Sequence, residues 1–394
     1  MEKDIQIGVG GLEITKEDKK LINEVLDSNR LSYGPFSRKF EGKFSKLHDS
    51  KFAVLTNSGT SSLHIAVAAL KEKYNWNDGD EILVPATTFI ATSNIVLHNN
   101  MRPVFVDVEP DTFNIDHTKI EEKITEKTRA IIPVHLLGLP ASMGPIMQIA
   151  KKHNLKVIED SAETMFAKYR GKSVGSFGDI GCFSTYIAHY IVTGVGGITT
   201  TSNPELAVML RSLANHGRDS IYVNIDDDKT KNKKKFREVI KRRFRFVRLG
   251  HSFRITEIEA ALGLSQLNRW QSIVKRRKEI ASRYLHGFKK LNEFLQLPVT
   301  PKDRDHTFML FGIVYKQGDK TDLINFLEDN GIETRDLLPL INQPVYVKLF
   351  GNLEDKYPVS RTLIRSGFYI GCHQYITNKQ IDYVINKFYE FFRK

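Results

Sequence analysis

Short apolar runs alternate with helical patterns over the first half of the chain. Between residues 50 and 201, runs rich in Val, Ile and Phe are separated by segments with an apolar residue every three or four positions. This pattern predicts strands at 52–55, 81–84, 104–108, 130–134 and 156–160, and helices at 61–70 and 91–98. Buried strands spaced by helices are typical of a mainly parallel sheet that is covered on both faces. Ligands of such sheets bind at the carboxyl ends of the strands.

The pattern changes after a charged segment at 226–250. Helices are predicted at 255–266, 273–291, 320–330 and 378–391, with a strand at 307–314. This mixture indicates a smaller α+β unit. We therefore expect two domains, a large α/β domain at 1–250 that includes an N-terminal arm, and a smaller α+β domain at 251–394.

Composition restricts the class of protein only broadly. Of the 394 residues, 41% are hydrophobic and 26% are charged, as in ordinary globular proteins. The N-terminus lacks a signal-peptide pattern, and every apolar run is shorter than the roughly 20 residues of a membrane span. We expect a cytoplasmic protein with no membrane partner. Cys182 and Cys372 cannot supply the thiolates of an ordinary iron–sulfur cluster, and neither a disulfide nor a metal site is expected.

Part of the net charge of +12 lies in the basic segment Lys229–Arg248. One interpretation is a solvated surface loop, since blocks of like charge are usually exposed. A second is an electrostatic funnel for a substrate that carries a diphosphate. Nucleic-acid binding is a third, but the chain has no zinc-finger spacing or RNA-binding signature, so no nucleic-acid partner is expected.

Three features with chemical potential follow predicted strands directly. Asn57–Ser62 joins a strand to a helix, where free amides and the helix dipole attract anions. Phe89 follows the next strand and offers either a stacking surface for an aromatic cofactor or a core contact. Asp160 ends a strand and is suited either to hold a protonated pyridine nitrogen or to cap a helix.

Two further motifs complete the series, Gly178–His189 and Thr193–Gly197. With segments 134–138, 215–218 and 253–263, their order resembles the DegT/DnrJ/EryC1/StrS family of sugar aminotransferases and dehydratases over nearly the whole chain. The resemblance implies the fold-type I aspartate aminotransferase architecture, with a mainly parallel seven-stranded sheet in the large domain. It also implies a pyridoxal phosphate (PLP) or pyridoxamine phosphate (PMP) cofactor, and a homodimer in which each subunit completes the other's active site.

The resemblance implies a role for each candidate cofactor residue. Phosphate contacts come from Gly59, Thr60 and Ser184; ring stacking comes from Phe89, a partner for the pyridine nitrogen from Asp160, and a contact with the ring hydroxyl from Glu163. The segment around Ser252 implies a contact with the cofactor phosphate of the neighbouring subunit.

His189 occupies the position of the family's Schiff-base lysine. Imidazole cannot form that covalent bond, but it can act as a general base near neutral pH. A branch of 3-dehydratases that act on nucleotide-linked 4-keto-6-deoxyhexoses shares this histidine, and Gly371–Gln374 resembles its GDP-sugar member. We therefore predict a dehydratase of deoxysugar biosynthesis, for lipopolysaccharide or another glycoconjugate, with a nucleotide-sugar substrate and glutamate as amine donor.

Two positions depart from the family pattern. Val195 replaces a glutamate in the family's Gly-Glu-Gly-Gly, and Ser252 replaces the asparagine of Gly-Tyr-Asn-Tyr/Phe-Arg. These departures keep two alternatives open. One is another nucleotide-sugar-modifying or aminotransferase-like enzyme of the same fold, including a cofactor-free isomerase, and the other is a non-catalytic homologue that binds a sugar nucleotide.

Overall fold

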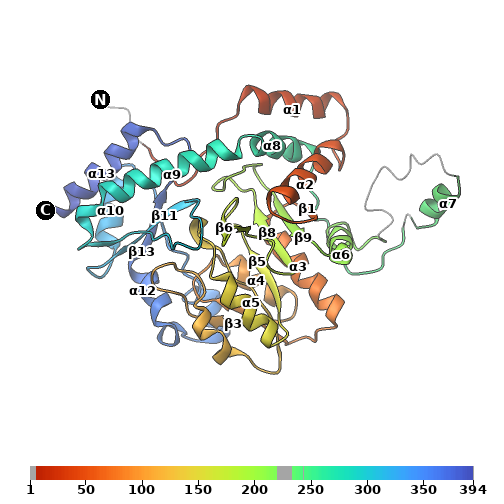
Figure 1. Ribbon diagram of the computed structural model, residues 1–394, viewed down its shortest axis with the longest axis horizontal. Helices are drawn as coiled ribbons and strands as arrows, with labels where there is room; N and C mark the ends of the chain where they lie inside the picture. The colour runs from red at the N-terminus through yellow and green to blue at the C-terminus, as the bar shows by residue number, and fades with distance from the viewer. Residues whose placement is uncertain (1–5, 220–232, 243, 394) are drawn as a thin grey trace.

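The central element of the computed structural model is a seven-stranded sheet (Figure 1), and the structure describes residues 6–219, 233–242 and 244–393. In spatial order its strands are β1 (Phe52–Thr56), β9 (Gly197–Thr201), β8 (Ile180–Ser184), β5 (Lys156–Asp160), β4 (Thr128–Ile131), β2 (Glu81–Pro85) and β3 (Arg102–Val106). Strand β9 runs antiparallel to both neighbours, and the other pairs are parallel. The predicted mainly parallel seven-stranded sheet is confirmed.

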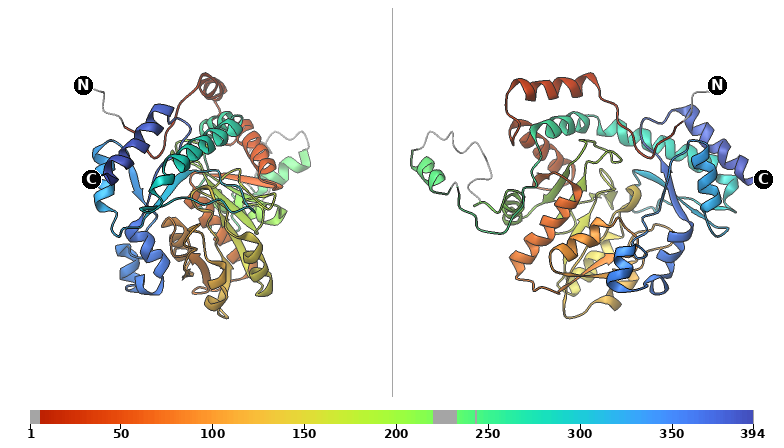
Figure 2. Two further views of the ribbon diagram at one scale, coloured as in Figure 1. Left: turned by 60° about the vertical axis from the view of Figure 1, so that its left-hand side comes forward. Right: turned by 180° about the vertical axis from the view of Figure 1, so that it is seen from behind.

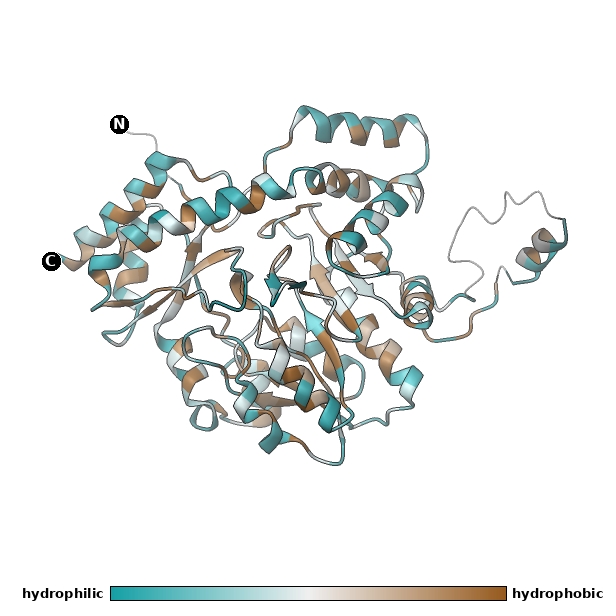
Figure 3. Cartoon of the chain, viewed as in Figure 1, coloured by the Kyte–Doolittle hydropathy of each residue, from teal (hydrophilic) through white to brown (hydrophobic). Residues whose placement is uncertain are grey.

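Helices cover both faces of this sheet, because successive side chains of its strands point to opposite sides. Ile82 and Val84 of β2 pack into one core, whereas Leu83 between them packs into another. The first core is covered by α3 (Gly59–Tyr74), α4 (Ala91–His98) and α6 (Pro204–Ala214), and the opposite face by α2 (Pro35–Leu47) and α5 (Met143–Lys152). Buried α3 is mostly brown in Figure 3, whereas α1 (Lys16–Asp27), on the surface, is mostly teal.

A second, antiparallel sheet of four strands lies beside the first. Its order is β10 (Leu295–Gln296), β11 (Leu310–Tyr315), β13 (Gly367–Gly371) and β12 (Thr334–Asp336). Its core includes residues of α9 (Trp270–Gly287), α10 (Thr321–Asp329) and α13 (Asn378–Phe392). This arrangement confirms the predicted α+β character of the tail. The remaining elements are the hairpin β6 (Lys168–Tyr169) and β7 (Lys172–Ser173), with helices α7 (Lys233–Arg242), α8 (Glu257–Leu267), α11 (Pro344–Phe350) and α12 (Pro358–Ser366).

The two sheets are tied together by buried contacts. Asp107, just after β3, accepts hydrogen bonds from the backbone N–H groups of Val359 and Ser360 in the first turn of α12, at 3.0 Å each. Helix α8, which follows the predicted domain boundary at residue 250, packs against α1 and α2. The division into 1–250 and 251–394 therefore stays a prediction.

The basic segment Lys229–Arg248 is only partly described, since residues 220–232 and 243 lie outside the described ranges. Its described helix α7 lies well away from the two sheets in Figure 1 and in the right-hand view of Figure 2. Cys182 and Cys372 are both buried and unbonded to each other. Within the described ranges, none of the helices has the length and apolar character that crossing a membrane requires.

Most of the elements that the local pattern predicted lie close to their predicted bounds. Helix α4 and strand β5 have the predicted bounds, whereas β3 begins two residues earlier than predicted and ends at Val106. Strand β8 was not predicted, and its sequence Ile-Gly-Cys-Phe-Ser explains why. Gly181 weakens strand propensity, yet only glycine fits there, because a Cβ atom would lie 2.5 Å from the Cα atom of Gly175. Tertiary packing therefore overrides local propensity in this strand.

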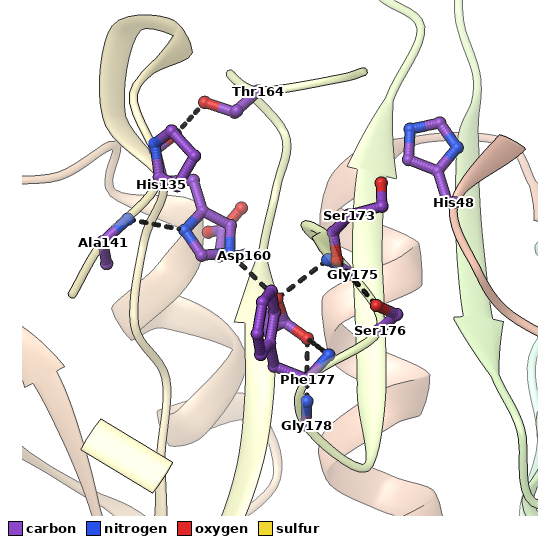
Figure 4. A network of polar contacts seen from close by, with 12 residues as sticks. His48, His135, Ala141, Asp160, Thr164, Ser173, Gly175, Ser176, Phe177 and Gly178 are labelled. Carbon is purple, nitrogen blue, oxygen red and sulfur yellow. Dashed lines mark hydrogen bonds and ion pairs between the residues drawn. The ribbon is translucent and has the colours of Figure 1, made fainter. Parts of the chain in front are cut away.

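A buried carboxylate fixes the end of β5. Glu159 accepts backbone N–H groups from Gly175 at 2.8 Å, Phe177 at 2.6 Å and Gly178 at 2.8 Å. It also lies 3.0 Å from Nε2 of His135, whose Nδ1 accepts the N–H of Ala141, so Nε2 carries the hydrogen and donates. Figure 4 shows this network, which joins β5 to the turn before β8 and to the segment after β4.

We expect Glu159→Gln to lower the free energy of unfolding by roughly 2–4 kcal/mol, because an amide cannot accept from all four donors and leaves buried N–H groups unpaired. Urea denaturation measures this change. The matched control is Glu121→Gln, which removes an exposed carboxylate that also contacts a histidine, His153 at 2.8 Å. It should leave the midpoint of urea denaturation unchanged, because an exposed ion pair contributes little to stability. Equal effects of the two substitutions would refute a structural role for the Glu159 network.

Candidate active site

A cavity of about 400 Å³ lies where the carboxyl ends of β5 and β8 face the second sheet. Its walls come from the start of α3, the ends of β5 and β8, and residues of β11 and β13. Seven of the eight site residues predicted from the sequence line it, namely Gly59, Thr60, Phe89, Asp160, Glu163, Ser184 and His189. Segments far apart in the chain therefore meet at the position that a doubly covered parallel sheet favours for ligands.

One end of the cavity is suited to an anion. Helix α3 begins at Gly59, and the side chain of Ser58 caps it by accepting the N–H of Ser61 at 3.0 Å. The N–H groups of Gly59 and Thr60 lie in the first turn, where a helix offers no acceptor of its own. Gly59 also packs closely on β8, because a Cβ atom there would lie 2.8 Å from Cβ of Ser184. Two amides and the Ser184 hydroxyl thus gather at a positive helix end.

Two buried acids form the floor. Asp160 accepts the Thr92 hydroxyl at 2.8 Å and the Ala162 N–H at 3.1 Å. Burial raises its pKa, while those two hydrogen bonds act in the opposite direction. Burial also raises the pKa of Glu163 to about 7; its bond from the Leu137 N–H at 3.0 Å opposes the rise, and the Asp160 charge adds to it. A carboxylate desolvated in this way favours a cationic partner.

His189 projects from the loop after β8. Its backbone N–H donates to the Tyr186 carbonyl at 2.9 Å, while its ring atom Nδ1 is buried and has no hydrogen-bond partner in the described part of the chain. Burial and the nearby Arg277 guanidinium lower the pKa of His189 to about 3, against the effect of a hydrogen bond with the Ala162 backbone. The imidazole is therefore neutral at physiological pH and able to accept a proton.

The structure resolves two alternatives that the sequence left open. Phe89 is 58% exposed and lies at the edge of the cavity, so the interpretation of Phe89 as a core residue is wrong. No helix begins after Asp160, where residues 161–167 form turns, so its interpretation as a helix cap is also wrong. Both side chains are available to a ligand in the cavity.

Ser252 lies outside the cavity. It is exposed, its backbone pairs with Asn215, and its hydroxyl accepts a hydrogen bond from Arg254 at 3.1 Å. Its predicted role concerns a neighbouring subunit, so that role stays a prediction.

Several residues of the site were not predicted. Thr92 is the second residue of α4 and donates a hydrogen bond to Asp160, while Tyr369 of β13 and Leu338 come from the second sheet and the segment beside it. Thr92 could have been found from its place just after the motif that contains Phe89. No local pattern marks the other two, because only the packing of the second sheet brings them to the cavity.

Comparison with known proteins agrees with this geometry. Residues 12–389 match the DegT/DnrJ/EryC1/StrS aminotransferase family, which confirms the resemblance inferred from the motif order. GDP-perosamine synthase of Escherichia coli O157:H7 is 34% identical over 382 residues, which are 95% of this chain and 96% of that protein. The dTDP-4-dehydro-2,6-dideoxy-D-glucose 3-dehydratase of Saccharopolyspora spinosa is 31% identical over 399 residues, 98% of this chain and 86% of that protein.

A solved structure is similar over its whole length. The structure of E. coli GDP-4-keto-6-deoxy-D-mannose-3-dehydratase with bound hydrated PLP superimposes with a TM-score of 0.87 at 26% identity. The match covers 98% of this chain and all of that one. These relatives include both a GDP-perosamine synthase and two 3-dehydratases.

The raised pKa of Glu163 predicts a pH-dependent stability. The unfolded chain releases this proton near the ordinary value of 4.5, whereas the folded protein releases it at about 7. Because the folded state retains the proton, the folded protein loses stability as pH rises through this window, by roughly 2–3 kcal/mol. Glu163→Gln removes the titration. The free energy of unfolding of this variant, relative to that of the wild type, should therefore increase by that amount from pH 4.5 to 7.5.

Urea unfolding of the cofactor-free protein at several pH values tests this expectation. Glu126→Gln, at an exposed position, is the control and should follow the wild type at every pH. A constant difference between Glu163→Gln and the wild type across this range would contradict the prediction.

Proposed function

Since the chain belongs to the DegT/DnrJ/EryC1/StrS aminotransferase family, we propose that it is a PLP- or PMP-dependent dehydratase of a nucleotide-linked 4-keto-6-deoxy sugar, with His189 as the general base. The family match and the PLP-bound relative support a sugar-modifying enzyme of a PLP-dependent family. The choice of dehydration rests on the chemistry of the cavity.

The residues of the cavity fit the cofactor. The amides of Gly59 and Thr60, with the Ser184 hydroxyl, would hold its phosphate, since the absence of a side chain at Gly59 lets the helix end approach Ser184 closely. Asp160 would pair with the pyridine nitrogen, and that cation would in turn keep the buried carboxylate ionised. The exposed ring of Phe89 would cover the cofactor ring, and Glu163 would contact its hydroxyl. When bound, the cofactor supplies an amine and a conjugated ring that takes up the electrons of a breaking C–H bond.

One observation carries the proposal for dehydration. Of the side chains that line the cavity, all within the described ranges, only that of His189 contains nitrogen, and none is a lysine. An aldehyde in the cavity therefore has no amine to tether it covalently. A neutral imidazole with an unpaired Nδ1 can instead accept a proton at that atom and return it to a leaving hydroxyl.

The other walls support such proton transfer. Met309, Leu310 and Leu338 present an apolar surface from the second sheet and the segment beside it. Apolar walls exclude water and so strengthen the electrostatic effect of the buried acids. Tyr186 and Val195 are exposed beside the cavity, and the loss of the family's glutamate at Val195 leaves this side without charge.

An aminotransferase is the second candidate function. The 34% identity to GDP-perosamine synthase favours it. The cavity without lysine weighs against it, because the family's aminotransferases use that lysine both as a tether and as a proton shuttle. A non-catalytic homologue that binds a sugar nucleotide is the third candidate, which the retained acids and the anion cradle disfavour.

The absence of a tether is directly testable. After treatment with PLP and borohydride, wild-type protein should carry no reduced adduct on any cavity peptide, because histidine cannot form the reducible bond. His189→Lys should gain one adduct at residue 189, located by peptide mass spectrometry. An adduct on another cavity peptide of the wild type would sink the proposal.

The same substitution site tests the reaction. With PLP, glutamate and GDP- or dTDP-linked 4-keto-6-deoxy sugars, we expect a glutamate-dependent absorbance change and a 3-deoxygenated sugar, identified by NMR. His189→Asn should lower kcat by about 10²–10⁴-fold. His286→Asn, at an exposed position of α9, is the control and should retain full activity. A 4-amino sugar as the only product would favour the aminotransferase.

A homodimer completes the proposed function. Residues 244–249 follow α7 in the chain and expose two large apolar side chains. Phe244 is 82% exposed and Leu249 is 97% exposed. Burying such side chains against a second copy would be favourable. This contact would bring the neighbouring Ser252 close to the partner subunit, in accord with its predicted role.

We expect Leu249→Asp to shift the protein from dimer towards monomer in sedimentation velocity, because a charge would be buried in the contact. Leu349→Asp, at a 54% exposed position of α11, is the matched control and should leave the distribution unchanged. If both variants sediment as the wild type does, this surface is not the dimer contact.

A further inference from the structure

A buried cation lies directly behind the loop that carries His189. Arg277 of α9 is only 1% exposed, and no carboxylate pairs with it among the described residues. Its N–H groups donate to three backbone carbonyls and one side-chain amide: Met309 at 2.6 Å, His189 at 3.1 Å, Cys372 at 3.5 Å and Oε1 of Gln374 at 3.1 Å. Its guanidinium also lies over the ring of Tyr190, 4.8 Å from the centroid.

Such a residue is costly to keep. Burying a charge without an opposite charge costs several kcal/mol, and an apolar side chain of similar volume often stabilises a protein as well or better. Burial accordingly lowers the pKa of Arg277 itself. Packing alone therefore gives no reason for an arginine at this position.

Two of the hydrogen-bond partners of Arg277 belong to the walls of the cavity. His189 and Met309 line the cavity themselves. Gln374 is next to His373, and Nε2 of His373 lies 3.2 Å from the carbonyl of Gly8. Val9, the residue after Gly8, also lines the cavity. The Arg277 side chain thus connects the loop after β8 to the residue before β11 and to the segment after β13.

Other hydrogen bonds hold this loop on either side of His189, and the hydroxyls of Tyr190 and Thr307 lie 2.7 Å apart. The hydroxyls of Thr185 and Thr193 lie 2.6 Å apart and close its base. Gln266 of α8 accepts the N–H of Val192 at 2.9 Å and donates to the Val192 carbonyl. Beyond its own turn to Tyr186, the backbone of His189 is anchored by Arg277.

We propose that Arg277 is a positioning residue for His189, whose carbonyl it fixes to the second sheet while placing a positive charge behind the imidazole. The inference rests on the proposed function, in which His189 is the general base. The charge favours the neutral ring, which is the form that accepts a proton. The other titratable groups around the ring are Asp160, Glu163, Tyr186 and Tyr369 in the cavity, and Tyr190, Cys372 and His373 behind it.

Arg277→Met and Arg277→Lys separate charge from geometry. Methionine removes the charge, whereas lysine retains it but cannot donate to all of these acceptors. Arg276→Met is the matched control, since Arg276 also lies on α9 and donates to a backbone carbonyl, that of Ile376 at 2.7 Å, away from the cavity. Thermal melts followed by circular dichroism establish that each variant folds, and Arg277→Gln replaces the methionine variant if that variant does not.

The first readout needs no substrate. In protein with ¹⁵N-labelled histidine, the His189 signal is identified by its absence from His189→Asn, and its pKa is followed by NMR with and without PLP. Arg277→Met should raise that pKa by about one pH unit. Arg277→Lys should stay closer to the wild type, and Arg276→Met should coincide with it.

The second readout is turnover. Both Arg277 variants should lower kcat by about 10–100-fold with little change in KM, because a general base displaced by as little as 1 Å loses much of its effect. The inference is overturned if the His189 pKa and kcat of the Arg277 variants match those of Arg276→Met. If the wild type forms no deoxygenated sugar but the pKa shift is present, Arg277 does position His189 and the proposed function is the part that fails.

Discussion

Two adjacent carboxylates at the end of β5 must face opposite sides of the sheet, and the cavity depends on this constraint. Side chains alternate along a strand, so Glu159 points with Val157 towards α5, and Asp160 points with Ile158 towards α3 and α4. Glu159 is saturated by three backbone N–H groups and His135, which fixes the strand end and the turn before β8. Asp160 is thereby held at a defined depth in the cavity, with only Thr92 and Ala162 as donors.

Glu159 and Asp160 differ in whether their carboxylates can still bind a ligand. A carboxylate that accepts four hydrogen bonds has nothing left to offer a ligand, whereas one that accepts two and is desolvated favours an added cation. The same logic applies on the opposite side of the cavity. Arg277 satisfies its donors on carbonyls and a ring face, so its charge stays uncompensated and acts on His189. The cavity thus lies between a buried acid, Asp160, and a buried cation, Arg277.

Features with a local cause could be predicted from the sequence. The seven site residues that line the cavity belong to short motifs at strand ends, and the topology of a parallel sheet brings strand ends together whatever their separation in the chain. Strand β8 and residues such as Tyr369, Leu338 and Arg277 have no such marker. They depend on how the second sheet and α9 pack against the first, which periodicity along the chain does not encode. Phe89 and Asp160 each carried two interpretations for the same reason, since burial decides between them and burial is a tertiary property.

The histidine at position 189 changes what the rest of the cavity has to provide. A covalent tether would hold a cofactor whatever the strength of its other contacts, so a cavity without one relies on non-covalent contacts alone. In the proposed site, the helix end at Gly59, the hydroxyl of Ser184 and the desolvated carboxylate of Asp160 would supply such affinity, because electrostatic contacts become stronger as water is excluded. The apolar walls from the second sheet are then part of binding as well as of proton transfer. A base that burial and a nearby buried arginine keep neutral is consistent with this arrangement, since it adds no second cation to the cavity.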